Sequence, residues 1–175
     1  MRCLTLSESA QWLRTQQIDG LAEDNRPCVF GSYELFCASP KQSWAQQGLA
    51  RDLLAWIGKF DTALFWVTDW PFSEPDEMAL ISSLRRSHGE SRLLIEAPGH
   101  VFASNEGDEL VGWIYLMMCF GWDGYLFASP YHGSMFQTSH EAFVWLLSSY
   151  SERFSEARRI IHSYDLKIHR ETPMA

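Results

Sequence analysis

The fold depends first on a run of five apolar residues, Ala63-Leu64-Phe65-Trp66-Val67, at positions 63–67. No polar residue alternates with them, and this pattern is typical of a central strand that is covered on both faces of its sheet. The run ends at Asp69-Trp70-Pro71, a combination that favours a loop. We therefore predict a buried central strand over residues 63–67.

Amphipathic helices are predicted on both sides of this strand. In residues 41–59, five apolar side chains recur at intervals of three to five residues, which places them on one side of a helix: Trp44, Leu49, Leu53, Trp56 and Ile57. Thr5 and Glu8 have the spacing of a capping box ahead of a helix that ends near residue 17. Further helices are expected over residues 73–88, 105–118 and 151–163.

Shorter segments predict the remaining strands. Residues 28–37 and 92–96 have strand composition, and two strands at 125–127 and 135–137 flank a turn-rich connection that indicates a β-hairpin. Thr138 and Glu141 have capping-box spacing, so a helix is expected to follow them. The basic residues from Lys167 onward are expected to form a loose tail.

Strands that are separated by helices predict an α/β fold, or an α+β fold, with a single-layer mixed sheet. We expect that sheet to be partly parallel, with helices packed on it and the late hairpin at its edge. No repeat or linker divides the sequence, so residues 1–175 are expected to form one domain, with residues 167–175 as a flexible tail.

Composition and charge limit the possible partners. The net charge of −8 disfavours binding to bare phosphate backbones or to an anionic membrane surface, and would suit a basic protein partner. Eleven Phe, eight Trp and six Tyr indicate an aromatic core or an aromatic-lined binding face. The four cysteines have no close pairing, and no apolar run is long enough for a membrane span, so we expect reduced thiols and a cytoplasmic location.

Familiar catalytic motifs are absent from the sequence. It contains no phosphate-binding loop, no dinucleotide-binding glycine pattern, no nucleophile elbow and no zinc-binding helix motif. Nucleotide hydrolysis, dinucleotide binding and zinc-protease chemistry therefore have no local support. We predict no cofactor and no bound metal.

The segment Glu96-Ala97-Pro98-Gly99-His100 is the most suggestive one for chemistry. If the strands at 63–67 and 92–96 are parallel neighbours, then Asp69, Glu96 and His100 meet at one edge of the sheet, where α/β proteins bind ligands. An imidazole between carboxylates can move a proton, so these three are the candidate catalytic residues. The competing interpretation is that both carboxylates cap backbone amides and that His100 is a turn residue.

Four other residues are candidates for binding. Trp70 and Phe72 lie in the loop after the central strand, where exposed aromatic rings could meet a partner. Asp123 lies between glycines beside a tryptophan, and His132 lies in the hairpin loop. Each also has a plain structural reading, as a packing or turn residue. Ser139-His140-Glu141 contains the residue types of a hydrolytic triad, but consecutive helical residues could not form its relay.

Four segments resemble a group of small bacterial proteins of unknown function. They lie within residues 63–141, at 64–70, 96–102, 120–126 and 139–141. The resemblance implies a bacterial cytoplasmic origin, and it implies no activity and no residue roles.

Together these observations favour a non-enzymatic protein-interaction protein, of the accessory or immunity type. One alternative is a small hydrolase or metal-assisted enzyme with its Asp/Glu/His site at the strand ends. Another is a small-ligand sensor with an aromatic pocket. The sequence does not predict an oligomeric state.

Overall fold

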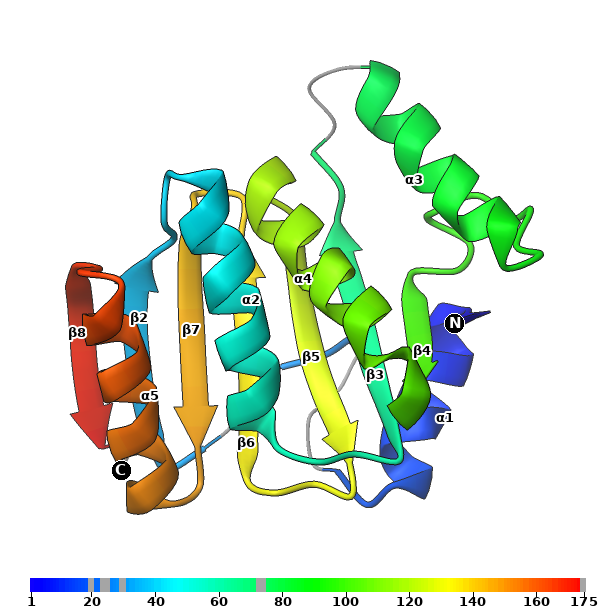
Figure 1. The fold of residues 1–175 in the computed structure, drawn as a ribbon. Helices are drawn as coiled ribbons and strands as arrows, with labels where there is room; N and C mark the ends of the chain where they lie inside the picture. The colour runs from blue at the N-terminus through cyan, green and yellow to red at the C-terminus, as the bar shows by residue number, and fades with distance from the viewer. Residues whose placement is uncertain (19–20, 23–25, 29–30, 72–74, 174–175) are drawn as a thin grey trace.

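The computed structural model of the chain describes residues 1–18, 21–22, 26–28, 31–71 and 75–173. In these residues eight strands form one sheet, in the order β1-β4-β3-β5-β6-β7-β2-β8 (Figure 1). The strands are β1 (Arg2–Leu4), β2 (Tyr33–Ala38), β3 (Thr62–Asp69), β4 (Gly99–Ala103), β5 (Asp123–Ser129), β6 (Ser134–Ser139), β7 (Phe143–Ser148) and β8 (Ile168–Pro173). The helices are α1 (Leu6–Thr15), α2 (Ser43–Ile57), α3 (Pro75–Ser87), α4 (Gly107–Phe120) and α5 (Ser151–Ser163), with a short 3₁₀ turn at Ser104–Glu106.

The prediction of a partly parallel sheet is wrong, because every pair of neighbouring strands is antiparallel. Most of the strands that a helix connects do run in the same direction, but they are not neighbours, since β2 lies between β7 and β8 and β5 lies between β3 and β6. The exception is β3 and β4, which are joined by α3 and are antiparallel neighbours. A helical connection therefore fixes neither the neighbour of the next strand nor, in every case, its direction. The fold is therefore α+β.

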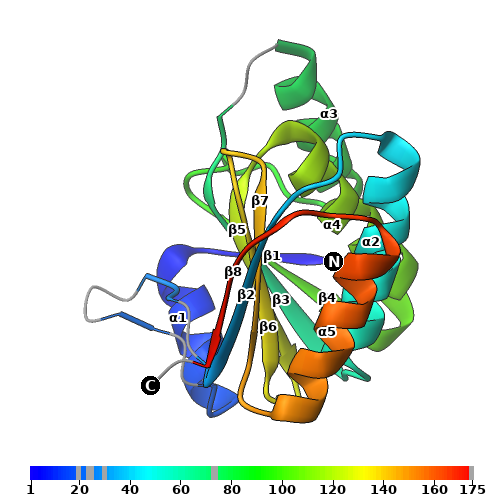
Figure 2. The ribbon, with the colours of Figure 1, turned by 90° about the vertical axis from the view of Figure 1, so that its left-hand side faces the viewer.

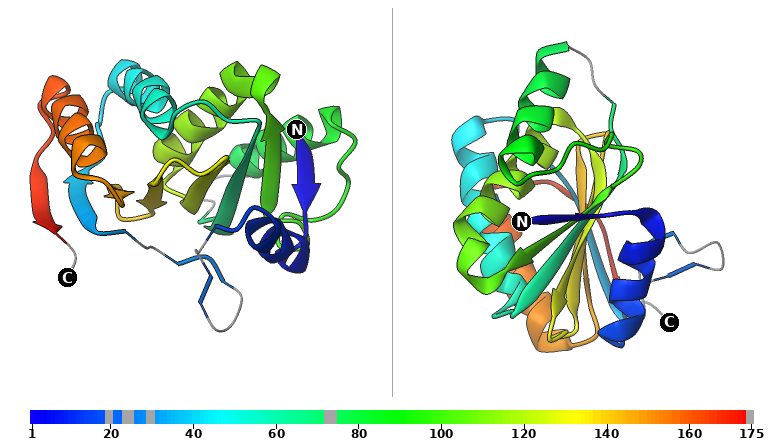
Figure 3. Two further views of the ribbon diagram at one scale, coloured as in Figure 1. Left: turned by 90° about the horizontal axis from the view of Figure 1, so that it is seen from below. Right: turned by 90° about the vertical axis from the view of Figure 1, so that its right-hand side faces the viewer.

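The helices cover the two faces of the sheet unequally. Helices α2, α4 and α5 lie side by side on one face, and α1 lies on the other (Figures 2 and 3). Helix α3 covers neither face and lies beyond the end of β3, apart from the other helices (Figure 1). Among the described residues, no helix combines the length and apolar composition that crossing a membrane requires.

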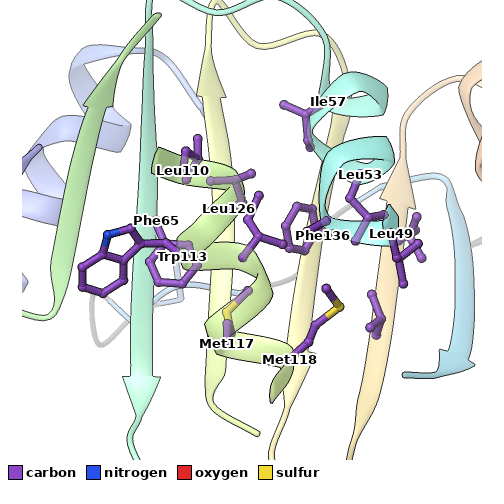
Figure 4. Packing of buried hydrophobic residues seen from close by; sticks show 14 of the residues in the cluster. Leu49, Leu53, Ile57, Phe65, Leu110, Trp113, Met117, Met118, Leu126 and Phe136 are labelled. Carbon is purple, nitrogen blue, oxygen red and sulfur yellow. The ribbon is translucent and has the colours of Figure 1, made fainter. Parts of the chain in front are cut away.

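The larger core lies between the sheet and helices α2 and α4 (Figure 4). The predicted apolar side of α2 is buried at Leu49, Leu53, Trp56 and Ile57, whereas Trp44 in the first turn is exposed. Residues 63–67 are fully buried in β3, as the apolar run predicts. Their side chains alternate between this core and a smaller one under α1, so the central strand is covered on both faces.

Local predictions succeeded at several places and failed at others. The capping box of Thr5 and Glu8 is present at the start of α1, and the hairpin is formed by β5 and β6. That hairpin lies in the middle of the sheet rather than at its edge. Residues 143–148 form strand β7 instead of a helix, residues 92–96 form a turn instead of a strand, and residues 168–173 form edge strand β8 instead of a loose tail.

Candidate functional site

Helix α3 forms one wall of a cleft at the end of β3. The helix begins at Pro75 with two acidic residues in its first turn and ends with Arg85 and Arg86, an arrangement that complements the helix dipole at both ends. Only Ile81 and Arg85 are buried along its length. Because so little of α3 packs against the protein, a space remains between the helix and the sheet.

The cleft has a volume of about 670 Å³. Residues 66–70 form one wall, residues 90–95 form a second, and α3 contributes Met78, Ser82, Arg85 and Arg86. Leu6, Arg26, Pro27 and Pro98 complete the lining. Met78 and Ile95 give it exposed apolar surfaces, and the nearly buried ring of Trp66 lies behind its wall.

Arg85 is the buried charged group of the cleft. Its side chain is only 2% exposed, and its Nη2 donates a hydrogen bond to the backbone oxygen of Ala97 at 3.0 Å. Its Nε has no hydrogen-bond partner. No described carboxylate forms an ion pair with this guanidinium. A buried cation without an anion is rare, because removing a charge from water costs several kcal/mol.

The cleft lining is positive in a protein that is strongly negative. It contains four arginines and only two acidic residues, Asp69 and Glu90, although the whole chain carries a net charge of −8. Glu90 forms an ion pair with Arg92, whose Nε and Nη2 donate hydrogen bonds to the Glu90 carboxylate at 2.9 and 2.5 Å. These hydrogen bonds lower the pKa of Glu90 to about 2. Glu90 is therefore ionised and already paired.

His100 lies behind the cleft and is completely buried. Its ring packs against the rings of Trp113 and Trp70, with centroids 4.6 and 5.8 Å away. Burial, and then the positive charge of Arg85, lower the pKa of His100 to about 3. The backbone of Phe65 and Pro98 lies near the ring, but neither ring nitrogen has a hydrogen bond of normal geometry. The imidazole is therefore neutral at physiological pH.

The three candidate catalytic residues do not share a site. Asp69 lines the cleft, whereas neither Glu96 nor His100 does. Glu96 is exposed, and its carboxylate caps the turn by accepting a hydrogen bond from the backbone N–H of Leu93 at 2.7 Å. The prediction assumed two parallel strands, but β3 and β4 are antiparallel and residues 92–96 are not a strand. Without that edge, the structure gives the three residues no common place to act.

Asp69 instead meets Asp123 and His140. The register between β3 and β5 pairs Asp69 with Asp123, and the turn between β6 and β7 brings His140 beside them. The Nδ1 of His140 lies 3.0 Å from Oδ1 of Asp123. This carboxylate raises the pKa of His140 above its ordinary value, first through the hydrogen bond and then through its charge. Because Asp69 and His140 are exposed, water screens the cluster, which suits a surface ion pair.

Two groups of described residues have the geometry to hold a metal ion. One is the Asp69, Asp123 and His140 cluster, and the other is His88, Glu106 and Glu109. In each group, the potential ligand atoms lie within 4.8 Å of one another. The second group is held by ordinary ion pairs, since Nε2 of His88 lies 2.6 Å from Glu109 and the N-terminal ammonium pairs with Glu106. No buried, unpaired ligand atom points to a cation in either group.

The four candidate binding residues are spread over the molecule. Trp70 is half-buried, lines the cleft and packs against Trp122 with ring centroids 4.8 Å apart. Phe72 lies outside the described residues. Asp123 is part of the cluster with His140. His132 lies at the opposite end of the sheet, where its Nε2 is 2.8 Å from the backbone oxygen of Lys59.

Sequence reasoning missed Arg85 and His140. For Arg85, the one available signal is its position four residues after Ile81, on the same side of α3. His140 was discounted because it was expected to lie at the start of a helix that Thr138 and Glu141 cap. Its partnership with Asp123 depends on the β6–β7 turn, which that expectation excluded.

We compared the chain with protein-family models, curated proteins and solved structures, and none of the three comparisons gave a match. The resemblance to small bacterial proteins therefore remains a prediction.

Proposed function

We propose that this protein binds a small, partly apolar molecule in the cleft between α3 and the end of β3. The observation that carries the proposal is a cleft of about 670 Å³ that combines apolar walls with a buried arginine. Ligand pockets in proteins have volumes of roughly 300–1,000 Å³ and the same mixture of apolar lining and a few polar groups. This function matches the small-ligand sensor among the hypotheses from the sequence.

The walls of the cleft support an apolar ligand. Trp66 is 1% exposed and belongs to the core under α1, so its ring is a rigid surface. Met78 and Ile95 are 50% and 83% exposed and line the same cleft, so together they present apolar surface that a ligand can cover. A ligand in the cleft would remove these surfaces from water, which favours binding.

Two adjacent serines on α3 give a matched test of this site. Ser82 lines the cleft, whereas the exposed Ser83 does not. We expect aromatic fragments, followed by two-dimensional NMR, to shift the amide signals of Thr68, Ser82 and Leu93. The bulky change Ser82→Trp should abolish these shifts, and Ser83→Trp should preserve them. Fragment binding that is unaffected by Ser82→Trp would place the ligand elsewhere and end the proposal.

A protein partner is a second candidate function, because Leu93 and Ile95 are exposed together in the loop beside the cleft. They are 67% and 83% exposed, and large apolar residues at interfaces supply much of the binding energy. Replacing both with serine should abolish co-purification of a partner without changing the melting temperature. If the protein remains alone in extracts of its native host at working concentration, this candidate fails.

A further inference from the structure

Arg85 is a buried cation with which no carboxylate in the described part of the protein forms an ion pair. We propose that the ligand of the cleft is a small monocarboxylate, and that its carboxylate pairs with the guanidinium of Arg85. This inference rests on the proposed function and adds the chemical class of the ligand. It explains why a helix with so little buried surface places an arginine at one of its two buried positions.

None of the neighbouring groups neutralises Arg85. The charge of Glu90 interacts with that of Arg85, but the Glu90 carboxylate accepts its three side-chain hydrogen bonds from Arg92. The Cys3 thiol lies near the guanidinium, but burial raises its pKa and outweighs the opposing effect of Arg85, so the thiol stays protonated. His100 is neutral in its aromatic surroundings. The positive charge therefore remains available to a ligand that carries the missing anion.

The number of buried cations favours a carboxylate over a phosphate. A guanidinium is planar and can donate two parallel hydrogen bonds to one carboxylate. Arg85 donates one hydrogen bond to Ala97 and interacts with the Cys3 thiol, and its Nε has no partner. A phosphate has a larger charge and more acceptors, but the other arginines do not add a second buried donor. Arg86 is exposed, and Arg92 is bound to Glu90 and to the backbone oxygen of Cys3.

The position of Arg85 also orients the ligand. The carboxylate would lie deep in the cleft, next to Arg85 and the Ala97–Pro98 backbone. The apolar part would extend along Trp66 and Trp70 toward Met78 and Ile95, which are exposed. A molecule with one anionic end and an aliphatic or aromatic body matches this distribution of charge and apolar surface.

The experiment compares each acid of a short series with the alcohol of the same skeleton. The probes are butanoate, octanoate and 4-phenylbutyrate, with butan-1-ol, octan-1-ol and 4-phenylbutan-1-ol, measured by NMR titration of the full chain at pH 7. Because a hydrogen-bonded ion pair is stronger than a neutral hydrogen bond, we expect at least one acid to bind about tenfold more tightly than its alcohol. Shifts should appear at Thr68, Ser82 and Leu93. Inorganic phosphate is the third probe and should bind more weakly than that acid.

Variants of two adjacent arginines test whether Arg85 is the residue that binds the carboxylate. Arg85→Met should reduce the affinity for the acid to that for the alcohol, whereas Arg86→Met should leave the ratio within about twofold of the wild type. Arg85→Lys keeps the charge and should retain part of the preference. The wild-type comparison of acid with alcohol needs no variant, so it tests the proposal even if Arg85→Met does not fold.

The outcomes separate the two proposals. If acids and alcohols bind the cleft equally, or if inorganic phosphate binds more tightly than any acid, the proposal of a monocarboxylate ligand is overturned. The proposal that the cleft binds a small molecule still stands in that case. If Arg85→Met still binds the acid more tightly than the alcohol, Arg85 is not the residue that binds the carboxylate. If no probe and no aromatic fragment shifts the cleft residues, both proposals fail.

Discussion

Helices α3 and α4 are of similar length, but they contact the protein in different ways. Helix α4 buries five apolar side chains against the sheet: Leu110, Trp113, Ile114, Met117 and Met118. Helix α3 buries one apolar side chain, Ile81, and one charged side chain, Arg85. Helix α4 therefore contributes to stability through apolar burial, whereas α3 places a cation beside a cleft.

This contrast separates residues that stabilise the fold from residues that are available for function. A side chain that fills the core is explained by the area that it buries. A buried arginine without an anion is not explained in this way, since it reduces stability until a partner arrives. The following predictions test this difference, from the largest expected effect to the smallest.

The same substitution in the two helices should have very different effects. Leu110 in α4 is fully buried, so Leu110→Ala should lower the free energy of unfolding by about 3 kcal/mol. Leu80 in α3 is 43% exposed and does not line the cleft, so Leu80→Ala should change it by less than about 1 kcal/mol. Urea denaturation measures both values. Equal losses would show that α3 packs as firmly as α4.

His100 should make the protein sensitive to acid. Its pKa is about 3 in the folded protein and about 6.5 when exposed, so between these values the unfolded chain binds the extra proton. Stability is therefore fully present above pH 6.5 and is lost as the pH falls toward 3. At 1.36 kcal/mol per pKa unit, the loss between pH 7 and pH 4 is about 3 kcal/mol.

In the variant His100→Phe, the new ring suits the aromatic surroundings, and the unfolded chain no longer has an imidazole at this position to bind a proton. We expect its loss of stability between pH 7 and pH 4 to be smaller than that of the wild type by about 3 kcal/mol. Carboxylates also contribute to acid unfolding, but they are present in both proteins and cancel in the comparison. His162 is exposed, so His162→Gln should reproduce the wild-type loss. Identical pH profiles for His100→Phe and the wild type would contradict the buried neutral imidazole.

Removing the charge of Arg85 should stabilise the protein when no ligand is present. Arg85→Met replaces a buried cation with an apolar side chain of similar length, and we expect a gain of about 1–3 kcal/mol in the free energy of unfolding. The lost hydrogen bond to Ala97 offsets part of the gain. Urea denaturation in ligand-free buffer measures the change, with Arg86→Met as the exposed control. A clear loss of stability would indicate that Arg85 serves the fold.

The smallest effect is expected at the edge of the cleft. In an NMR titration the pKa of His140 should be above 6.5, because Asp123 favours the charged imidazole. Asp123→Asn should return it to its ordinary value. Since the pair favours the protonated histidine, any stability it adds is present below pH 6.5 and is lost as the pH rises through the folded pKa. An unshifted His140 would show that the pair does not form.

Much of the fold could be predicted because it depends on local apolar patterns. The run at 63–67 identified β3, and the spacing of Leu49, Leu53 and Ile57 identified α2. Strand β7 was missed because a short apolar run suits a helix or a strand equally well, and because Thr138 and Glu141 ahead of it have the spacing of a helix cap. The sheet order was missed because pairing between residues as far apart as Thr62 and Ser129 leaves no local mark in the sequence.

The candidate site was less predictable than the fold. Asp69 was correctly placed at the end of a buried strand, but its partners depend on which strands are neighbours. The antiparallel β3–β5 register brings Asp123 beside Asp69. His100 is on β4, opposite Phe65 of β3, and is buried among aromatic rings. Arg85 could not be recognised, because a lone arginine at the end of a helix is usually solvated. It donates to Ala97, directly after residues 92–96, which form a turn where a strand was expected.

The order of strands also has a consequence for how the chain reaches this structure. The first three strands pair only with strands from later in the chain: β1 with β4, β2 with β7 and β8, and β3 with β4 and β5. During synthesis, the first 98 residues therefore contain three strands and no partner for any of them. Such distant pairing slows folding, because the chain must close long loops before any ladder forms. Of the three, β2 stays longest without a partner, because β7 begins only at Phe143, whereas the central strand β3 can pair with β4 once Gly99 and the residues after it have been made.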